Sequence, residues 1–426
     1  MYRKLFFASI LLCLVLSLSA CREKPTVEAP GSVTEGDMVF VPIDESSSGY
    51  RLKKYLGSLE ELTVPSEIAG KPVVEIGNSA FYNNKTLTKV HLPETVARIE
   101  NYAFDSCKKL REIVFSENIE SIGFNAFSDC ESLKEINLPK SLKIIEANAF
   151  IRCKSLESIY VNAALENIKR DAFSYCDGIK GVYVPDIAAW CKIKFDSAES
   201  NPLYYAEQLY VSGKLSENLT ITGVETVSEY AFFGFSGLKT LTLGEGVINL
   251  GNSCFSNCSS LTRVNFSDSV KKIGMSSFNR CTSLEYVAMG RGLEYFSGLS
   301  FYGCTAIYAV EIPDLSAWCE AFFYTDNFGS ANPIIYAQVI IINGREVTEL
   351  VIPEGVKRIS TLAFIGFKGD KVTLPKSLKT IDETAFYMCY NLTKIHFDGK
   401  KSDFSSLSVG ANNFEYVTEE GKTFNE

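Results

Sequence analysis

The sequence predicts a repeat solenoid in which each 23-residue coil contributes one short parallel strand. Three observations carry this prediction. A Phe, usually preceded by Ala or Ser, recurs every 23 residues from Phe81 to Phe173 and again from Phe232 to Phe301, and a third block holds Phe364 and Phe386. Each unit also holds apolar residues at fixed positions and one short alternating stretch. A single unit of this kind cannot bury its apolar side, whereas stacked units cover one another.

Two parts of each unit predict different local structures. In the unit that begins at Ile122, residues 135–138 alternate between polar and apolar side chains and predict a strand with one buried face. Pro139 ends this strand because proline cannot donate to a ladder. The stretch 145–153 predicts a compact turn or a short helical segment that packs Phe150 inward. The eleven repeat phenylalanines are Phe81, Phe104, Phe127, Phe150, Phe173, Phe232, Phe255, Phe278, Phe301, Phe364 and Phe386.

The repeat order I-x-x-x-A-F-x-x-C-x-x-L-x-x-I-x-L-P resembles that of the BspA-type leucine-rich repeats of bacterial surface proteins. This resemblance extends over residues from about 38 to 426. It implies a leucine-rich-repeat solenoid of the right-handed β/α type, shaped as a horseshoe or a rod. We expect an N-terminal capping coil at 37–75, the solenoid at 76–397 and a C-terminal cap at 398–426, because the open ends of a solenoid need cover.

Two interruptions of the repeat, at about 186–213 and 314–344, are copies of one another. The first is introduced by PDIAAWC at 185–191 and the second by PDLSAWC at 313–319. Asp186 and Asp314 each follow a proline and precede an apolar stretch, so each predicts the N-cap of a short helix. We expect the tryptophans in these segments to pack rather than to bind a ligand. The regular solenoid is predicted to resume at 211–213 and at 342–344.

The N-terminus predicts an exported lipoprotein. Residues 1–20 begin with a short basic stretch and continue uncharged from Leu5, for fewer residues than a spanning helix needs. The sequence LSAC that ends at Cys21 resembles the bacterial lipobox, which makes Cys21 the predicted lipid attachment site; the alternative is an ordinary secretory signal. Residues 21–36 predict a flexible tether. We therefore expect a monomer that is lipid-anchored in the cell envelope, at the outer membrane or the cell surface.

The thirteen cysteines predict buried thiols rather than a disulfide framework. Eight of them occupy the third position after a repeat Phe, where two other copies place Phe235 and Phe367, so this slot is apolar. Neighbouring coils about 4.8 Å apart would bring equivalent cysteines within bonding distance, and a disulfide staircase remains the alternative. Side chains that point in parallel give poor disulfide geometry, which favours free thiols.

Composition and motifs argue against several functional classes. The formal net charge is −9, which disfavours nucleic-acid binding because a phosphate-binding surface needs a cationic excess. The only histidines, His91 and His396, lie 305 positions apart, and no hydrolase, metalloprotease or calcium-loop motif is present. We expect no enzymatic activity, no metal and no cofactor.

A solenoid of this kind would present its outward strand residues as one continuous face. These residues mix aromatic, polar and charged side chains, a composition that suits a large partner held by a few anchors. The resemblance implies an adhesin-like protein–protein interaction module that binds a host matrix protein or a bacterial surface protein. The alternative is a glycan-binding or structural scaffold lipoprotein of the envelope without a host ligand. The candidate partner-binding residues are His91, Asn137, Tyr160, Tyr183, Arg263 and Tyr286.

Overall fold

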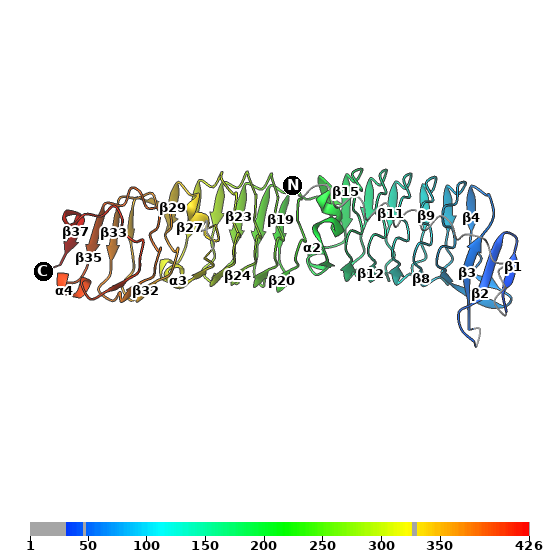
Figure 1. The fold of residues 1–426 in the computed structure, drawn as a ribbon, viewed down its shortest axis with the longest axis horizontal. Helices are drawn as coiled ribbons and strands as arrows, with labels where there is room; N and C mark the ends of the chain where they lie inside the picture. Colours follow the sequence, from blue (N-terminus) through cyan, green and yellow to red (C-terminus); the bar gives the residue numbers. More distant parts are fainter. Residues whose placement is uncertain (1–30, 46–47, 326–329, 426) are drawn as a thin grey trace, which may run out of the picture.

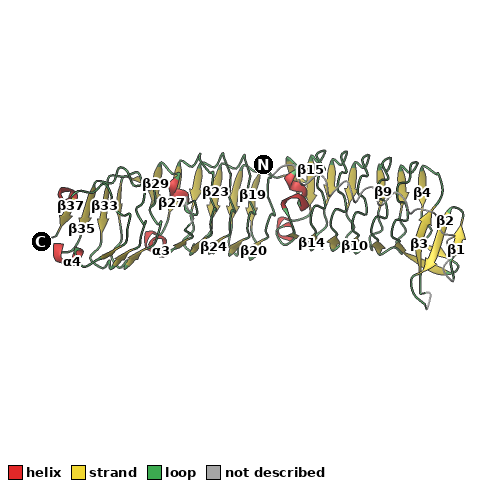
Figure 2. Cartoon of the chain, viewed as in Figure 1, coloured by secondary structure: helices red, strands yellow, loops and turns green. Residues whose placement is uncertain are grey.

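The chain forms an elongated solenoid of parallel coils, which confirms the fold class that the repeat predicts. The computed structural model describes residues 31–45, 48–325 and 330–425. Of the two expected shapes, the described part adopts the rod, with short strands running along its upper and lower edges (Figure 1). Helices are few and short (Figure 2). The expected signal peptide, Cys21 and most of the expected tether lie outside the described residues.

Each regular coil contains a strand in which the central side chain is buried and its neighbours point outward, as in β11 with Ile136 at its centre. We call the surface made by these strands the strand-side face. Its strands are β4 (Glu61–Thr63), β7 (Lys89–His91), β9 (Glu112–Val114), β11 (Glu135–Asn137), β13 (Ser158–Tyr160), β15 (Gly181–Val184), β17 (Gln208–Val211), β19 (Asn218–Ile221), β21 (Thr240–Leu243), β23 (Arg263–Phe266), β25 (Tyr286–Ala288), β27 (Ala309–Ile312), β29 (Val339–Ile342), β31 (Glu349–Val351), β33 (Lys371–Leu374), β35 (Lys394–Phe397) and β37 (Lys422–Phe424).

Most coils also hold a second strand, which has only two residues in every coil after β6 and adds to the single strand per coil that the sequence predicts. Two residues are too few to show an alternating pattern, so periodicity could not reveal these strands. The second column comprises β6 (Lys71–Ile76), β8 (Arg98–Ile99), β10 (Ser121–Ile122), β12 (Ile144–Ile145), β14 (Asn167–Ile168), β16 (Lys194–Phe195), β20 (Thr226–Val227), β22 (Asn249–Leu250), β24 (Lys272–Ile273), β26 (Tyr295–Phe296), β28 (Phe322–Phe323), β32 (Arg358–Ile359), β34 (Thr380–Ile381) and β36 (Ser408–Val409).

The two ends of the described chain depart from the regular coil. At the N-terminal end, the strands β1, β2 and β3 extend the second column beyond β6, and β5 pairs with β6. Ordered structure therefore begins inside the stretch expected to be a tether, because β1 pairs with β2 in an antiparallel arrangement. These strands are β1 (Val33–Glu35), β2 (Met38–Pro42), β3 (Tyr50–Tyr55) and β5 (Glu67–Ile68). The C-terminal end adds α4 (Lys401–Phe404) and the 3-10 helix η4 (Glu419–Gly421).

The repeat phenylalanines stack face to face through the interior. Phe127 lies 5.0 Å from Phe104 and 5.2 Å from Phe150 between ring centroids, with planes inclined by 5° and 3°. The segment that carries each Phe is a turn, so the helical alternative is wrong. Residues two positions before and after the Phe have positive φ, as do Asn125 at 53° and Asp129 at 55°.

This backbone aims alternate N–H groups at the next coil. Asn125, Phe127 and Asp129 donate to the carbonyls of residues 147, 149 and 151 at 3.2, 2.7 and 2.9 Å. The turns are therefore joined by hydrogen bonds, as the strands are.

The cysteine slot has a hydrogen-bonding role that the sequence analysis missed. Each of the eight repeat cysteines donates its thiol to the carbonyl of the Phe in the preceding coil; Cys130, for example, reaches the Phe104 oxygen at 3.2 Å. All eleven described cysteines are buried free thiols, which confirms the expectation and excludes the staircase among them. Burial raises the pKa of the Cys107 thiol to about 12, so it stays protonated as a donor.

The two inserts have the same construction. Asp186 caps α2 (Ile187–Trp190) by accepting from the N–H groups of residues 188 and 189, and Asp314 caps α3 (Leu315–Glu320) in the same way. Trp190 and Trp318 are only 1% and 3% exposed, which confirms their packing role. Each insert continues through 3-10 turns: η1 (Ala198–Ser200) and η2 (Pro202–Tyr204) in the first, and η3 (Pro333–Ile335) in the second.

Side chains of the first insert replace backbone donors that the repeat would otherwise supply. In regular coils, the carbonyl that precedes a Phe accepts the N–H of the Phe one coil earlier, as Ala126 accepts from Phe104. The insert that immediately precedes the coil of Ala231 carries no repeat Phe. Its carbonyl accepts instead from Trp190 Nε1 at 2.8 Å and from Asn201 Nδ2 at 2.9 Å.

The second insert repeats this arrangement at Ala363, which accepts from Trp318 and Asn332. The same lack of a preceding repeat Phe explains why Phe235 and Phe367 take the cysteine slot. The insert immediately before each of these residues offers no repeat Phe carbonyl to which a thiol could donate.

Each insert returns to the strand ladder at β17 and β29, which pair in parallel with β15 and β27, and a hairpin that the sequence did not predict follows at 212–213 and 343–344. The strand β17 pairs with β18 (Lys214–Leu215), and β29 pairs with β30 (Arg345–Val347), both antiparallel. Because the hairpin occupies the free edge of β17 or β29, the next coil cannot extend the sheet. A further interruption falls between β9 and β11. The strand-side face is thus four sheet segments and not one continuous ladder.

Candidate binding surface

All six candidate residues lie on the strand-side face, at the outward positions of their strands. His91, Asn137, Tyr160 and Tyr183 are the third residues of β7, β11, β13 and β15. Arg263 and Tyr286 are the first residues of β23 and β25. The sheet segments bring two pairs of these residues together, place Asn137 in register beside Tyr160, and leave His91 apart from both pairs.

The first pair belongs to a ladder of three tyrosines. In-register pairing of β13, β15 and β17 aligns Tyr160, Tyr183 and Tyr210. Their ring centroids are 4.3 and 4.4 Å apart, with planes inclined by 14° and 7°. Gly181 leaves room for this stack, since an added Cβ would lie 3.2 Å from the Tyr183 ring. Burial, with Glu135 and Tyr183 nearby, raises the pKa of Tyr160, which keeps its hydroxyl protonated.

Tyr210 is the member of the ladder that sequence reasoning missed. It lies 27 residues after Tyr183 because the first insert lengthens the coil, so a search at 23-residue spacing passes over it. The available signal was the QLYV stretch at 208–211, which repeats the alternating pattern of GVYV at 181–184.

The second pair forms a cation–π contact. The Arg263 guanidinium lies 3.9 Å from the centroid of the Tyr286 ring. The Tyr286 hydroxyl donates to Glu311 Oε2 at 2.6 Å, so one tyrosine is held between a cation and a carboxylate on three neighbouring strands. Burial and the bond to Glu311 raise the pKa of Tyr286. Glu311 was not among the predicted binding residues, because nothing in its own strand marks it as a partner of Tyr286.

Of the other two candidates, His91 lies on the first sheet segment and Asn137 on the second, where it aligns with Tyr160. His91 aligns with Thr63 and Val114 in the first segment. Asn137 donates to Glu135 Oε1 at 2.9 Å and lines a hollow of about 520 Å³ between β9 and β11. Among the described residues, no strand pairing joins these two coils on this face.

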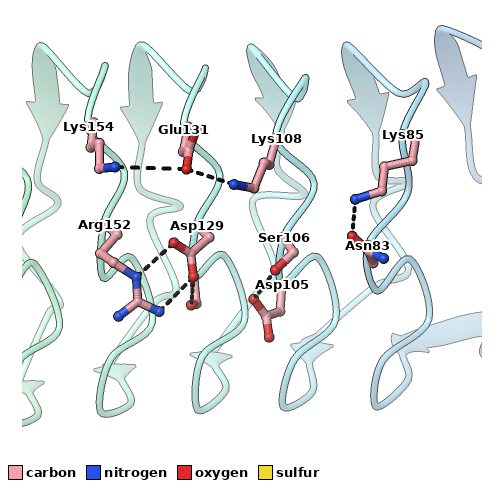
Figure 3. Close-up of polar contacts among 10 residues, drawn as sticks. Asn83, Lys85, Asp105, Ser106, Lys108, Asp129, Glu131, Arg152 and Lys154 are labelled. Carbon is pink, nitrogen blue, oxygen red and sulfur yellow. Dashed lines mark hydrogen bonds and ion pairs between the residues drawn. The ribbon is translucent and has the colours of Figure 1, made fainter.

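A different face of the solenoid is largely occupied by contacts with itself. We call it the Phe-turn face; it is made by the turns that carry the repeat phenylalanines, and Figure 3 shows polar contacts on part of it, from Asn83 to Lys154. Arg152 donates to both carboxylate oxygens of Asp129 at 2.7 and 2.6 Å. Glu131 is held by Lys108 at 2.9 Å and faces Lys154 at 3.9 Å. Over these coils the charged side chains pair from one coil to the next.

The described residues contain neither a cluster of potential metal ligands nor a helix that could span a membrane. Among the described residues, no three His, Cys, Asp or Glu side chains gather as metal ligands. No helix within the same residues combines the length and apolar character needed to cross a bilayer.

Comparison with known proteins agrees with the repeat architecture. The profile of the family described as "BspA type Leucine rich repeat region" matches six copies, over residues 55–195, 208–328 and 342–419. A crystal structure of a leucine-rich repeat protein from Bacteroides ovatus is 21% identical, with a TM-score of 0.55 over 92% of this chain and 100% of that chain.

Two further solved structures are similar at lower TM-scores. A leucine rich cell surface protein from Faecalibacterium prausnitzii is 21% identical, with a TM-score of 0.39 over 89% of this chain and 98% of that one. The pneumococcal vaccine antigen PcpA is 16% identical, with a TM-score of 0.48 over 90% of this chain and 99% of that one. No curated protein matches the chain.

Proposed function

Because the chain belongs to the BspA-type leucine-rich repeat family, we propose that it is a non-enzymatic binding protein whose strand-side face holds a protein partner, as an adhesin does. One observation carries this proposal: the stack of Tyr160, Tyr183 and Tyr210 on an outward sheet surface. Tyrosine is enriched at the energetic centres of protein interfaces because it offers a large rigid ring and a polar end.

The stack prepares the tyrosines for binding before a partner arrives. Each ring is confined by its neighbour at 4.3 or 4.4 Å, so little side-chain entropy remains to be lost on association. The Tyr210 hydroxyl donates to Gln208 at 3.0 Å, which fixes the last ring from its own strand. Three parallel rings held in this way form an aromatic surface fit for a complementary protein patch.

A second anchor lies beyond the first hairpin. Arg263 and Tyr286 already adopt a stacked arrangement, and arginine and tyrosine are both common in interface hot spots. The hairpin formed by β17 and β18 ends the tyrosine-bearing segment, so a ligand that reaches both anchors must extend past it. This separation favours a large protein over a small molecule.

The binding test compares two double variants of the mature chain. Tyr160→Ala with Tyr183→Ala removes two rings of the ladder, and the control Tyr82→Ala with Tyr387→Ala removes exposed tyrosines from the Phe-turn face. Loss of buried aromatic anchors costs 2 kcal/mol or more, so affinity for an immobilised matrix or bacterial surface protein should fall at least about thirtyfold in the first variant only. The melting temperature should change little in either variant.

Two outcomes of this assay would contradict the proposal. Equal binding by wild type and the ladder variant would show that the ligand uses another surface. Binding to a glycan array but to no protein would favour the alternative of a glycan-binding or scaffold lipoprotein.

The proposal includes attachment to the cell envelope through a lipid on Cys21, at the outer membrane or the cell surface. Support comes from the LSAC sequence that ends at this residue. Labelling with an alkynyl fatty acid should mark the wild type and fail on Cys21→Ala, and the variant should be released. Label retained by Cys21→Ala would refute this attachment site. Protease shaving of intact cells then distinguishes a surface location from a periplasmic one.

A further inference from the structure

Comparing the two inserts shows which of their residues the fold requires and which it does not. Beside the first insert, on the Phe-turn face, lies a hollow of about 460 Å³. Besides Ile151 and Ser174, three tyrosines and three carboxylates line it: Tyr175, Tyr204, Tyr205, Asp171, Asp177 and Glu199.

One of these tyrosines belongs to the framework. The Tyr205 hydroxyl accepts the backbone N–H of Tyr175 at 3.1 Å. At the second insert, the Tyr336 hydroxyl accepts the backbone N–H of Gly303 at the same 3.1 Å. Burial raises the pKa of Tyr205 to about 12, as expected for a neutral structural group. Both inserts therefore need this tyrosine to hold the preceding turn.

The other two tyrosines and the three carboxylates are not required by the framework. The two copies align when residues near the repeat Phe are counted from it and residues near the Asn-Pro pair are counted from that pair; the second copy is three residues longer between the two. The second insert has neutral residues at every one of these positions and still forms the same helix cap, tryptophan contact and tyrosine contact. Its counterparts of Asp171, Tyr175, Asp177, Glu199 and Tyr204 are Leu299, Gly303, Thr305, Ser330 and Ile335.

The hollow is negatively charged. Its lining contains no Lys or Arg, and none of the ion pairs found among the described residues includes Asp171, Asp177 or Glu199. The basic side chains one coil earlier are already engaged, Arg152 by Asp129 and Lys154 by Glu131 (Figure 3). Clefts lined by one sign of charge concentrate ligands of the opposite sign.

The tyrosines add a second attraction for a cation. Tyr175 is 62% exposed and Tyr204 is 39% exposed, so their rings are accessible. The Tyr204 ring packs edge-on against Tyr205, with centroids 4.9 Å apart and planes at 89°. Gly234 makes room for it, since an added Cβ there would lie 2.8 Å from Tyr204 Cδ2. An ammonium group over a tyrosine face is attracted by the ring quadrupole.

We propose that this hollow binds an ammonium group, with its charge shared among the carboxylates and its apolar parts against Tyr175 and Tyr204. The same chemistry is offered by the lysine side chain of a partner protein or by a quaternary ammonium headgroup. This site lies away from the strand-side face and does not depend on what that face binds.

The test titrates the mature chain with two probes, N-acetyl-lysine amide and tetramethylammonium chloride, by calorimetry or by tyrosine fluorescence. Saturable binding that weakens with added salt is expected for at least one probe. Tighter binding of the lysine derivative assigns the site to a protein partner, and tighter binding of tetramethylammonium assigns it to a quaternary headgroup.

The variants use residues that the second insert already carries in the same fold. The charge variant is Asp171→Leu, Asp177→Thr and Glu199→Ser, and the ring variant is Tyr175→Gly with Tyr204→Ile. Each should weaken binding at least about tenfold with an unchanged circular dichroism spectrum. The strand-side variant Tyr160→Ala with Tyr183→Ala should bind both probes like wild type.

Three results would overturn the proposal. The first is the absence of saturable binding of either probe to wild type. The second is binding by the charge variant equal to that of wild type. The third is a neutral oligosaccharide that binds the hollow while neither cation competes.

Discussion

Replacing Phe127 by Ala is the most direct test of how the solenoid is held together. The ring is fully buried and has three aromatic neighbours: Phe104 at 5.0 Å, Phe150 at 5.2 Å and Phe115 edge-on at 5.8 Å. A buried Phe→Ala change costs about 3 to 5 kcal/mol, and aromatic pairs contribute about 0.5 to 1.5 kcal/mol each beyond their area. Three such pairs place the expected loss at the upper end of that range.

The neighbouring coils cannot close over the cavity. The N–H of Phe104 donates to residue 126 at 2.7 Å, and that of Phe127 donates to residue 149 at 2.7 Å, so the backbone fixes the spacing of the coils. A cavity that cannot collapse gives the larger losses in mutational series.

The assay is urea unfolding of the mature chain, followed by circular dichroism and tryptophan fluorescence. Phe81→Ala should cost less than Phe127→Ala, because Phe81 has one parallel neighbour, Phe104 at 4.6 Å, and one tilted neighbour, Tyr55 at 5.6 Å. Asn137→Ala on the exposed face should cost under about 0.5 kcal/mol. Comparable losses at Phe127 and Asn137 would refute the assignment of inside and outside.

Three other predictions concern thiols, pH and the inserts. The buried cysteines should react slowly with Ellman's reagent in the native chain and readily after denaturation without reductant; recovery of four or fewer free thiols would indicate disulfides instead. Burial opposes ionisation of Glu75, but its hydrogen bonds and ion pairs with Arg98 and Arg51 outweigh this, and its pKa is lowered. The ionised carboxylate therefore stabilises the fold at neutral pH, and this stabilisation is lost as pH falls through the lowered pKa. Glu75→Gln should lower the free energy of unfolding at pH 7, and the two proteins should become equally stable in acid. A stability difference that does not change with pH would contradict this. Asn201→Ala removes one donor from each of the carbonyls of residues 230 and 231, which keep Phe233 N–H and Trp190 Nε1, and leaves the buried Leu203 N–H without its acceptor. It should cost about 1 to 3 kcal/mol in thermal or urea unfolding.

The sequence was sufficient to predict features that recur. The 23-residue spacing identified the coil, the strand with its buried centre, and the inward Phe, because each is repeated many times with the same side-chain chemistry. The N-cap at Asp186 followed from a local rule that needs no knowledge of neighbouring coils.

Features that depend on contacts between coils could not be predicted in this way. The hydrogen bond from the Cys130 thiol to the Phe104 carbonyl joins residues 26 positions apart, and its only trace in the sequence is a preference for cysteine at that position. The break between β9 and β11 arises from how two coils diverge. Tyr210 was hidden because an insert changed the spacing, although its ring completes the predicted pair Tyr160 and Tyr183.

The inserts show why a repeat protein can acquire binding sites where its repeat is broken. In a regular coil, the backbone donors and acceptors of each turn are committed to the adjacent coils, which limits what its residues can do. In an insert, Trp190 and Asn201 supply the donors that the next coil requires, and Asp186 and Tyr205 hold the local turns. Once these few side chains satisfy the framework, the remaining positions can vary, as the neutral counterparts in the second insert demonstrate. The tyrosines and carboxylates around the first hollow occupy positions that the fold does not constrain. Ligand recognition therefore explains them better than folding does.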